Sequence, residues 1–232
     1  MGFKDNEIMK NNNSNIVIDK VKKINNYTKN FTGHDNPELK RIFEEESKKK
    51  KLSPIVEPEV GRFLNFYIRS IQAQKVLELG TGIGYSTIWL AEALKYTNGK
   101  LISLELDNDK YNIAKENIKK ARLNTDLVEL ILQDAISYID SLIQSDKKEN
   151  FDLIFIDLEK TLYPDLVERC IKIVSENGAI IADDTLFKPK GLRKKVSDPV
   201  DKYNNQVFND KRLYSSILPI GDGLTLSLKL SL

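Results

Sequence analysis

The chain has 232 residues, enough for one substantial core, and 41% of them are hydrophobic while 30% are charged, as in soluble globular proteins. The formal net charge of +2 excludes a strong overall attraction to nucleic acid or to membranes. A single cysteine, Cys170, excludes an internal disulfide and agrees with a cytoplasmic location, and no apolar run reaches the roughly 18 residues that span a bilayer.

The first 55 residues are expected to form an extension that precedes the main domain. Residues 1–15 are polar and rich in asparagine, so we expect a disordered start without the apolar stretch of a secretory signal. Apolar residues recur at helical spacing over 15–30, and Pro37 after Asn36 suits the first turn of a second helix. The lysines at 48–51 indicate a solvated helix end, with contact to an anionic substrate as the alternative.

A further helix is expected from Glu57 to Ile71, again with apolar residues at helical spacing. The helices between Ile16 and Ile71 carry more apolar surface than an extension of this size buries by itself. We therefore expect a homodimer that uses part of this region. A cap over the main domain is the alternative.

From Lys75 onward, short apolar runs that indicate strands alternate with helical patterns. This alternation predicts a parallel sheet with helices on both faces. The last two runs are joined by Gly221-Asp222-Gly223, a composition typical of a hairpin turn. The predicted fold class is therefore α/β, with seven mostly parallel strands, a C-terminal antiparallel hairpin and N-terminal helices. The strands are expected at 75–79, 100–105, 127–132, 151–157, 178–182, 213–220 and 224–230.

A glycine-rich turn, Glu78-Leu79-Gly80-Thr81-Gly82-Ile83-Gly84, joins the first of these strands to a helix. Glycines let the backbone approach a ligand closely, and the N–H groups of a helix start point toward it. The spacing differs from the G-x-G-x-x-G of dinucleotide folds, and Glu78 would repel a pyrophosphate. The turn resembles motif I of the S-adenosylmethionine-dependent methyltransferases, whose cofactor is cationic. A tight turn without a ligand is the alternative.

Acidic residues follow each of the five parallel strands, at the sheet edge where ligands bind in such folds. Glu105, about 20 residues beyond the glycine turn, can accept hydrogen bonds from both ribose hydroxyls. Asp134 and Ala135 are expected beside the adenine, unless Asp134 only caps the next helix. The remaining cofactor-binding residues expected from the chain's own pattern are Glu78, Gly80, Gly82, Tyr85, Ser86 and Asp157.

A second expected site consists of Asp157, Asp183 and Asp184, which end the fourth and fifth parallel strands. Three carboxylates supply hard oxygen ligands for Mg²⁺ or for another divalent ion such as Mn²⁺ or Ca²⁺. Two adjacent carboxylates at one strand end also repel each other unless a counter-ion is present. A zinc site of histidine and cysteine is excluded, because the chain has one residue of each type.

Two further segments make the family resemblance specific. Residues 154–163, IFIDLEKTLY, and 180–187, IIADDTLF, resemble the fourth- and fifth-strand motifs of the cation-dependent O-methyltransferases, which include the catechol and caffeoyl-CoA enzymes. The segment PIGDGL at 219–224 is also similar, and the likeness runs from about Val56 to the C-terminus. It implies a Rossmann-like methyltransferase domain over residues 56–232, with S-adenosylmethionine as the methyl donor.

By position, the resemblance makes the three aspartates metal ligands and Lys160 the general base, with Asp157 beside it in the catalytic set. Val56 falls where a backbone group holds the methionine carboxylate of the cofactor. Phe187, like Lys160, falls where the family contacts the substrate, as an aromatic wall against the substrate ring. Asp184 departs from the usual asparagine, which adds one negative charge. A plain salt bridge of Lys160 to a neighbouring acid is the alternative to its role as base.

The resemblance implies a Mg²⁺-dependent O-methyltransferase that acts on a small catechol-like or phenylpropanoid substrate, including a CoA ester. A chelating metal lowers the pKa of a substrate hydroxyl, Lys160 takes the proton, and the oxyanion attacks the methyl group. One alternative is methylation of 5-hydroxyuridine in tRNA, for which basic residues within 188–195 would meet phosphates. The other is a cofactor-binding sensor without chemistry, against which the intact set of acids and Lys160 argues.

Overall fold

The computed structural model describes residues 23–24, 27–28, 30–34, 36–49, 55–124, 126–145 and 150–231. The chain divides into two compact units, Met1–Asp35 and Asn36–Leu232. In the first unit, residues 23–24 and 27–28 are helical, and the rings of Tyr27 and Phe31 lie 5.1 Å apart. The disorder predicted for residues 1–15 and most of the helix predicted over 15–30 fall outside the described residues. The domain boundary after residue 55 stays a prediction.

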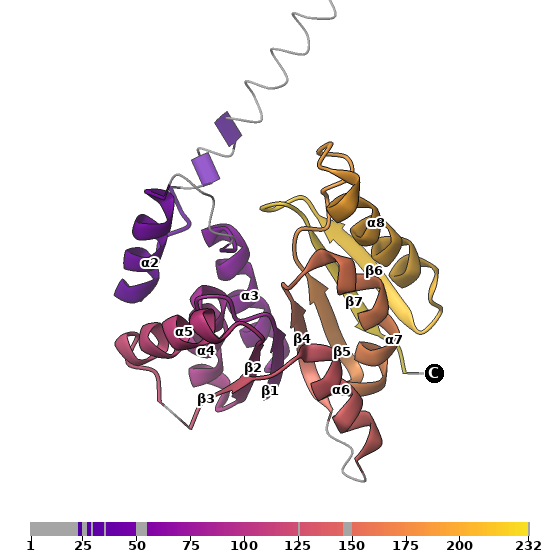
Figure 1. The fold of residues 1–232 in the computed structure, drawn as a ribbon, viewed down its shortest axis with the longest axis horizontal. Helices are drawn as coiled ribbons and strands as arrows, with labels where there is room; N and C mark the ends of the chain where they lie inside the picture. Colours follow the sequence, from indigo (N-terminus) through magenta and orange to yellow (C-terminus); the bar gives the residue numbers. More distant parts are fainter. Residues whose placement is uncertain are drawn as a thin grey trace, which may run out of the picture. The chain divides into compact units, whose positions relative to one another are not determined.

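A seven-stranded sheet forms the framework of the second unit (Figure 1). Its strands are β1 Lys75–Leu79, β2 Lys100–Glu105, β3 Val128–Leu132, β4 Phe151–Ile156, β5 Val174–Ala182, β6 Leu213–Leu218 and β7 Leu224–Lys229. Their order across the sheet is β3-β2-β1-β4-β5-β7-β6. Strands β1 to β5 run parallel, and β7 runs antiparallel to both β5 and β6. The predicted fold class is therefore confirmed.

Strand β5 is longer than the sequence pattern predicts, because it begins at Val174 and not at Gly178. Val174 pairs with Phe151 of β4, after which the register shifts. Asn177 has a φ of 61°, a left-handed conformation that interrupts the regular strand. The polar run 175–177 thus lies within the strand at an irregularity, where apolar patterning gives no signal.

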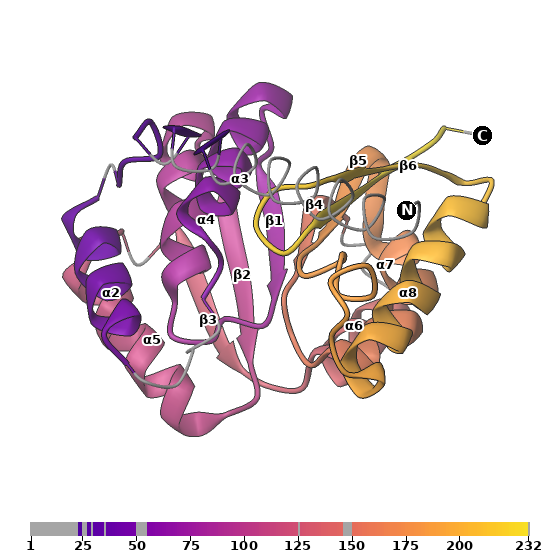
Figure 2. The ribbon, with the colours of Figure 1, turned by 90° about the horizontal axis from the view of Figure 1, so that it is seen from above.

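Helices cover both faces of the sheet (Figure 2). The helices on one face are α2 Pro37–Ser47, α3 Pro58–Ile71, α4 Tyr85–Thr97 and α5 Asn108–Lys120. Those on the other face are α6 Ala135–Gln144, α7 Tyr163–Ile173 and α8 Lys194–Asn209, and the short 3₁₀ helix η1 Lys160–Leu162 precedes α7. Successive strand residues point to opposite faces, so Val76 packs with the first group and Leu77 with the second. In the described part of the chain, no helix is both long and apolar enough to cross a membrane.

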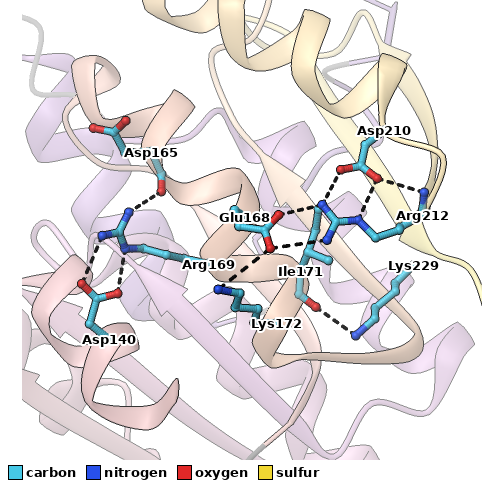
Figure 3. A network of polar contacts seen from close by, with 9 residues as sticks. All are labelled: Asp140, Asp165, Glu168, Arg169, Ile171, Lys172, Asp210, Arg212 and Lys229. Atoms are coloured by element: carbon cyan, nitrogen blue, oxygen red, sulfur yellow. Dashed lines mark hydrogen bonds and ion pairs between the residues drawn. The ribbon is translucent and has the colours of Figure 1, made fainter. Parts of the chain in front are cut away.

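Polar contacts tie the β6–β7 hairpin to α7 (Figure 3). The guanidinium of Arg212, just before β6, donates to Glu168 of α7 at 2.7 Å and to Asp210 at 2.7 and 2.9 Å. Lys229 of β7 donates to the carbonyl oxygen of Ile171 at 2.9 Å, near the C-terminal end of α7. Each exposed ion pair adds at most about 1 kcal/mol. Together they fix the register of the hairpin against the helical layer.

Candidate active site

A cavity of about 620 Å³ opens at the carboxyl ends of β1, β2 and β4. Most of the predicted site residues line it, which brings the expected cofactor set and part of the expected metal set into one space. Those residues are Val56, Gly80, Gly82, Tyr85, Ser86, Glu105, Asp134, Ala135, Asp157, Lys160 and Asp184. A second cavity, of about 670 Å³, lies at the amino ends of β1 to β3, and no predicted site residue lines it.

Three predicted residues are buried and do not line the cavity, namely Glu78, Asp183 and Phe187. Glu78 lies near the end of β1 and Asp183 directly follows β5, so both are buried next to residues that line the cavity. Phe187 is 8% exposed, and its backbone carbonyl accepts a hydrogen bond from the N–H of Leu192 at 3.1 Å. The structure therefore does not bring the Phe187 ring to the cavity wall, where the family resemblance suggests an aromatic contact with substrate.

The cavity also has apolar lining residues that the sequence pattern does not single out. Leu106 and Leu158 directly follow the strand-end acids Glu105 and Asp157, and Val196 comes from α8. Leu106 is 71% exposed, so most of its side chain is accessible to a ligand. In the sequence, only their position directly after the acids Glu105 and Asp157 marks these two leucines. At that position an apolar side chain can contact a flat ligand.

The glycine turn holds β1 against β4. Gly80 has a φ of +102°, and a Cβ atom there would lie 2.0 Å from the carbonyl oxygen of Asp157. Only glycine permits both this conformation and this approach. The N–H groups of Gly80 and Thr81 donate to the carbonyl oxygen of Leu104 at 3.1 and 3.0 Å, which also ties the turn to β2. The three strand ends that form the cavity are thus held by one turn.

Glu105 is anchored by backbone groups on both sides of the cavity mouth. Its Oε2 atom accepts from the N–H of Gly82 at 2.7 Å, and its Oε1 atom accepts from Leu106 at 3.0 Å and from Asp107 at 2.9 Å. The side chain is only 8% exposed and lines the cavity. Each carboxylate oxygen has two lone pairs, and Oε1 already accepts two hydrogen bonds while Oε2 accepts one, so Oε2 can still accept from a ligand's hydroxyl group. The geometry is compatible with the predicted ribose contact.

Asp134 has the capping role that the sequence leaves open as its alternative. Its Oδ1 atom accepts from the N–H of Ser137 at 2.8 Å, which satisfies one of the unpaired donors at the start of α6. Asp134 and Ala135 also line the cavity. The cap and a place at the cavity are therefore combined in one side chain.

Glu78 lies beneath the turn and is fully buried. Its Oε2 atom accepts hydrogen bonds from the hydroxyls of Thr87 at 2.6 Å and Ser103 at 2.5 Å, while its Oε1 atom has no hydrogen-bond partner among the described residues. Burial raises the pKa of Glu78 to about 7. Ser103 also lies 2.6 Å from the hydroxyl of Thr81, so the carboxyl group stabilises the turn from inside.

Replacing this carboxyl should make stability less dependent on pH. The raised pKa means that protonated Glu78 favours the folded state. Its contribution to the free energy of unfolding is complete below about pH 4.5 and is lost as the pH rises through about 7. Between pH 5 and pH 8, the stability of Glu78→Gln relative to the parent should therefore improve by roughly 2 kcal/mol. Thermal or urea unfolding of both ligand-free proteins at the two pH values measures this. A constant difference would contradict the assignment.

Lys160 stands between two of the three aspartates. Its Nζ atom lies 2.9 Å from Oδ1 of Asp157, 2.9 Å from Oδ2 of Asp184 and 2.8 Å from the hydroxyl of Tyr163. Burial alone would lower the pKa of Lys160, but Asp157, Tyr163 and Asp184 raise it well above its usual range. In this arrangement Lys160 is a charged ammonium. The salt bridge to Asp157, which the sequence offers as the alternative to a role of Lys160 as base, is thus present.

The third aspartate, Asp183, is 2% exposed, and its Oδ1 atom has no hydrogen-bond partner among the described residues. Burial, together with the charges of Asp157 and Asp184, raises the pKa of Asp183 well above its usual range. Asp184 adopts a φ of 62°, a left-handed conformation that asparagine and aspartate tolerate best. Asp157 and Asp184 share the single ammonium of Lys160, so the cluster keeps uncompensated negative charge even when Asp183 carries a proton.

This donor set fits a hard divalent cation by its chemistry, since it offers carboxylate oxygens, one of them without a partner. Its present geometry is different. In the part of the chain that the structure describes, no group of three or more His, Cys, Asp or Glu side chains is arranged to hold a metal ion. The ammonium of Lys160 lies between two of the carboxylates instead. The predicted metal site therefore stays a prediction.

A mostly parallel sheet whose last strand inserts antiparallel, with a ligand cavity at its carboxyl edge, defines a methyltransferase-type α/β protein. Comparison with known proteins makes the assignment specific. The family model described as O-methyltransferase matches residues 29–230. The chain therefore belongs to the O-methyltransferase family.

Individual relatives agree with this assignment. Caffeoyl-CoA O-methyltransferase 1 of Eucalyptus globulus is 32% identical over 74% of this chain and 73% of its own length. The catechol O-methyltransferase of Niastella koreensis is 36% identical over 62% of this chain and 64% of its own length. Among solved structures, a Klebsiella pneumoniae protein described as an O-methyltransferase aligns with a TM-score of 0.77 and 28% identity, over 90% of this chain and 96% of its own. The predicted family and the predicted enzyme class, an S-adenosylmethionine-dependent O-methyltransferase, are confirmed.

Proposed function

We propose that the enzyme methylates one of two neighbouring hydroxyl groups on a small aromatic substrate, with S-adenosylmethionine as methyl donor and Mg²⁺ or a similar divalent cation as cofactor. One observation carries this proposal. A single cavity is lined both by the glycine turn with Glu105 and by Asp157, Lys160 and Asp184. The names of the relatives, a caffeoyl-CoA and a catechol enzyme, support this substrate class.

The residues of the glycine side would hold the methyl donor. Glu105 would accept from a ribose hydroxyl at Oε2, and Asp134 with Ala135 would lie along the adenine. Val56 would meet the amino-acid end with a backbone group, beside Tyr85 and Ser86 at the start of α4. Leu106 adds an apolar contact next to Glu105. When bound, the donor supplies an electrophilic methyl group, and these residues would orient it toward the acidic side of the cavity.

Glu105→Ala should weaken binding of S-adenosylmethionine at least severalfold, because the ribose loses its acceptor and Gly82 loses the anchor of its N–H group. Titration calorimetry measures the change. The control is Glu116→Ala, which removes the same charge from the exposed surface of α5. Equal affinity in parent and Glu105→Ala would remove the ribose role from Glu105.

On the acidic side, Asp157, Asp183 and Asp184 would hold the cation, which lowers the pKa of a chelated hydroxyl group. Lys160 would then receive the hydroxyl proton at Nζ, which requires that it first leave its ion pairs and release its own proton to solvent in the open cavity. The burial of Lys160 assists that loss once the neighbouring negative charge is compensated. The cavity walls would hold the substrate oxygen near the methyl group for attack.

The phosphates of a CoA ester or of tRNA would find cations beside the cavity. Arg193, Lys194 and Lys195 are exposed at the start of α8, which has no side-chain N-cap. Positive side chains at a helix N-terminus repel its dipole, and a bound anion offsets that cost. Lys188 and Lys190 are instead paired with Asp201 and Asp222. This favours an anionic extension on the substrate.

A substrate panel tests the function. Catechol, caffeoyl-CoA and tRNA containing 5-hydroxyuridine are each incubated with enzyme and S-adenosylmethionine, with Mg²⁺ or with EDTA. Mg²⁺-dependent turnover of the first or second substrate supports the proposal, and turnover of the tRNA alone replaces it with the RNA reading. Methyl transfer that persists in EDTA removes the metal. Binding of the donor without any transfer would favour the sensor alternative.

We also propose a homodimer that uses α3. Phe66 is 68% exposed on this helix. The partly buried rings of Phe63 and Tyr67, on the same helix, stack on each other with their centroids 5.9 Å apart. Phe63, Phe66 and Tyr67 are spaced i, i+3 and i+4, so they share one side of α3, and apolar side chains gathered in one place mark an interaction surface. Light scattering at micromolar concentration should give twice the mass of the chain, and Phe66→Asp should halve it. Tyr214→Ser, at a 71% exposed position on β6, is the control and should leave the mass unchanged. A monomeric parent would contradict the assembly.

A further inference from the structure

We infer that Lys160 is a built-in competitor of the divalent cation, so that the cation enters its site only by displacing the Lys160 ammonium from between Asp157 and Asp184. The inference rests on the proposed function, because it takes these carboxylates as the cation's ligands. It adds a second state of the site, in which the enzyme's own ammonium group replaces the ion.

The first argument is geometric. Lys160 Nζ lies at the same distance, 2.9 Å, from one oxygen of each aspartate. A Mg²⁺ ion held by Asp157 and Asp184 at the usual metal–oxygen distance of about 2.1 Å would need the space beside these carboxylates that the ammonium now takes. An ammonium and a divalent cation cannot share that space, because they overlap and repel each other. Occupancy by one therefore excludes the other.

The second argument concerns how well the ammonium is held. A lysine has three N–H donors, and those of Lys160 meet Asp157, Asp184 and Tyr163. Tyr163 is completely buried, and its hydroxyl lies 3.2 Å from the carbonyl oxygen of Ile156 and 3.1 Å from that of Asp183. The tyrosine thus links the ammonium to the ends of both β4 and β5. In its position between the two aspartates, the Lys160 ammonium therefore has a partner for each of its three N–H donors.

The third argument is the balance of charge. One ammonium serves two carboxylates, those of Asp157 and Asp184, and Asp183 keeps an oxygen without a partner among the described residues. A divalent ion compensates the cluster better, so the exchange is favourable when enough cation is present. Asp184 strengthens both states, since an asparagine at that position would give the ammonium a neutral hydrogen bond in place of an ion pair.

Mn²⁺ binding measures the competition without any turnover. The titration uses the full chain with Mn²⁺ as the probe, followed by the electron paramagnetic resonance signal of unbound Mn²⁺. Lys160→Met, which keeps the aliphatic stem, should bind Mn²⁺ at least tenfold more tightly than the parent. The matched control is Lys190→Met, which removes an exposed ammonium paired with Asp222. It should change the affinity less than threefold, because its ammonium does not lie between the ligands.

A second variant guards against loss of folding in Lys160→Met. Tyr163→Phe keeps the ring that packs edge-on against Tyr203 at 5.6 Å and removes only the hydroxyl that holds the ammonium. It should bind Mn²⁺ a few-fold more tightly than the parent. Calorimetry with S-adenosylmethionine shows for each variant that the fold and the donor site are intact.

The outcomes separate the inference from the proposed function. Equal or weaker Mn²⁺ binding by folded Lys160→Met and Tyr163→Phe, with a parent that binds Mn²⁺, overturns the inference and leaves the function standing. If neither the parent nor the variants bind Mn²⁺ while all bind S-adenosylmethionine, the metal part of the proposed function fails and the inference fails with it. If Lys160→Met binds Mn²⁺ more tightly than the parent, and the gain exceeds that of Lys190→Met, the result supports the competition even when Tyr163→Phe binds as the parent does.

Discussion

Asp183→Asn should lower the rate of methyl transfer by about a hundredfold or more, an effect of roughly 3 kcal/mol on the activation barrier, while the affinity for S-adenosylmethionine stays nearly unchanged. Asp183 is buried at the end of β5 and does not line the donor's cavity, so its proposed task is to hold the cation. Initial rates and donor calorimetry on the same preparation measure the two quantities.

The same variant should keep its fold. Removing one carboxylate from the cluster of Asp157, Asp183 and Asp184 relieves repulsion in the metal-free protein. Added Mg²⁺ should raise the melting temperature of the parent by mass action and that of the variant much less. Asp165→Asn, on the exposed surface of α7, is the matched control and should behave as the parent does. Normal turnover of Asp183→Asn in EDTA would show that no metal takes part.

Gly80→Ala should abolish donor binding and destabilise the protein by about 3 kcal/mol or more. The backbone at Gly80 has a φ of +102°, and the added Cβ atom would lie 2.0 Å from the carbonyl oxygen of Asp157. The obstacle is backbone, which cannot rotate away as a side chain does. Relief requires separating the turn from β4, which moves Asp157 and opens the donor cavity at the same time.

Gly191→Ala is the control for this variant. Gly191 also has a positive φ, +73°, but no atom lies within 4 Å of the position where its Cβ would be. It should therefore show only the conformational penalty, of about 1 kcal/mol. Urea unfolding compares the two variants, and calorimetry measures donor binding. Equal stability losses would show that the contact between Gly80 and Asp157 is not what limits the turn.

The sequence was sufficient for the parallel part of the fold because two local signals coincide there. Each inner strand is a short apolar run that is buried on both faces, and each ends at an acidic residue followed by a helix. Glu105 illustrates this, because its type and its distance from the glycine turn already indicate its position at the cavity. Only the second part of β5 was predicted. Asn177 has a left-handed conformation and the pairing with β4 shifts in register there, and apolar patterning detects neither feature.

The part of the site that the sequence does not reveal depends on contacts between distant segments. Asp157 and Lys160 are three residues apart, so their ion pair is a local expectation. The approach of Asp184 to the same ammonium depends on how β4 and β5 pair, and the hydroxyl of Tyr163 joins only because α7 packs under both strand ends. Phe187 is buried and does not line the cavity, so its predicted contact with the substrate stays a prediction that rests on its place in the motif alone.

The place of β7 in the sheet has a consequence for protein synthesis. β7 is the last of the seven strands to leave the ribosome, yet it lies between β5 and β6. Until it emerges, β6 has no strand to pair with and β5 keeps an open edge, which offers unpaired backbone groups to other nascent chains. Closure of the sheet therefore waits for the last of the seven strands in chain order. A chain truncated before Leu224 would expose that edge to aggregation even though every predicted active-site residue had already been made.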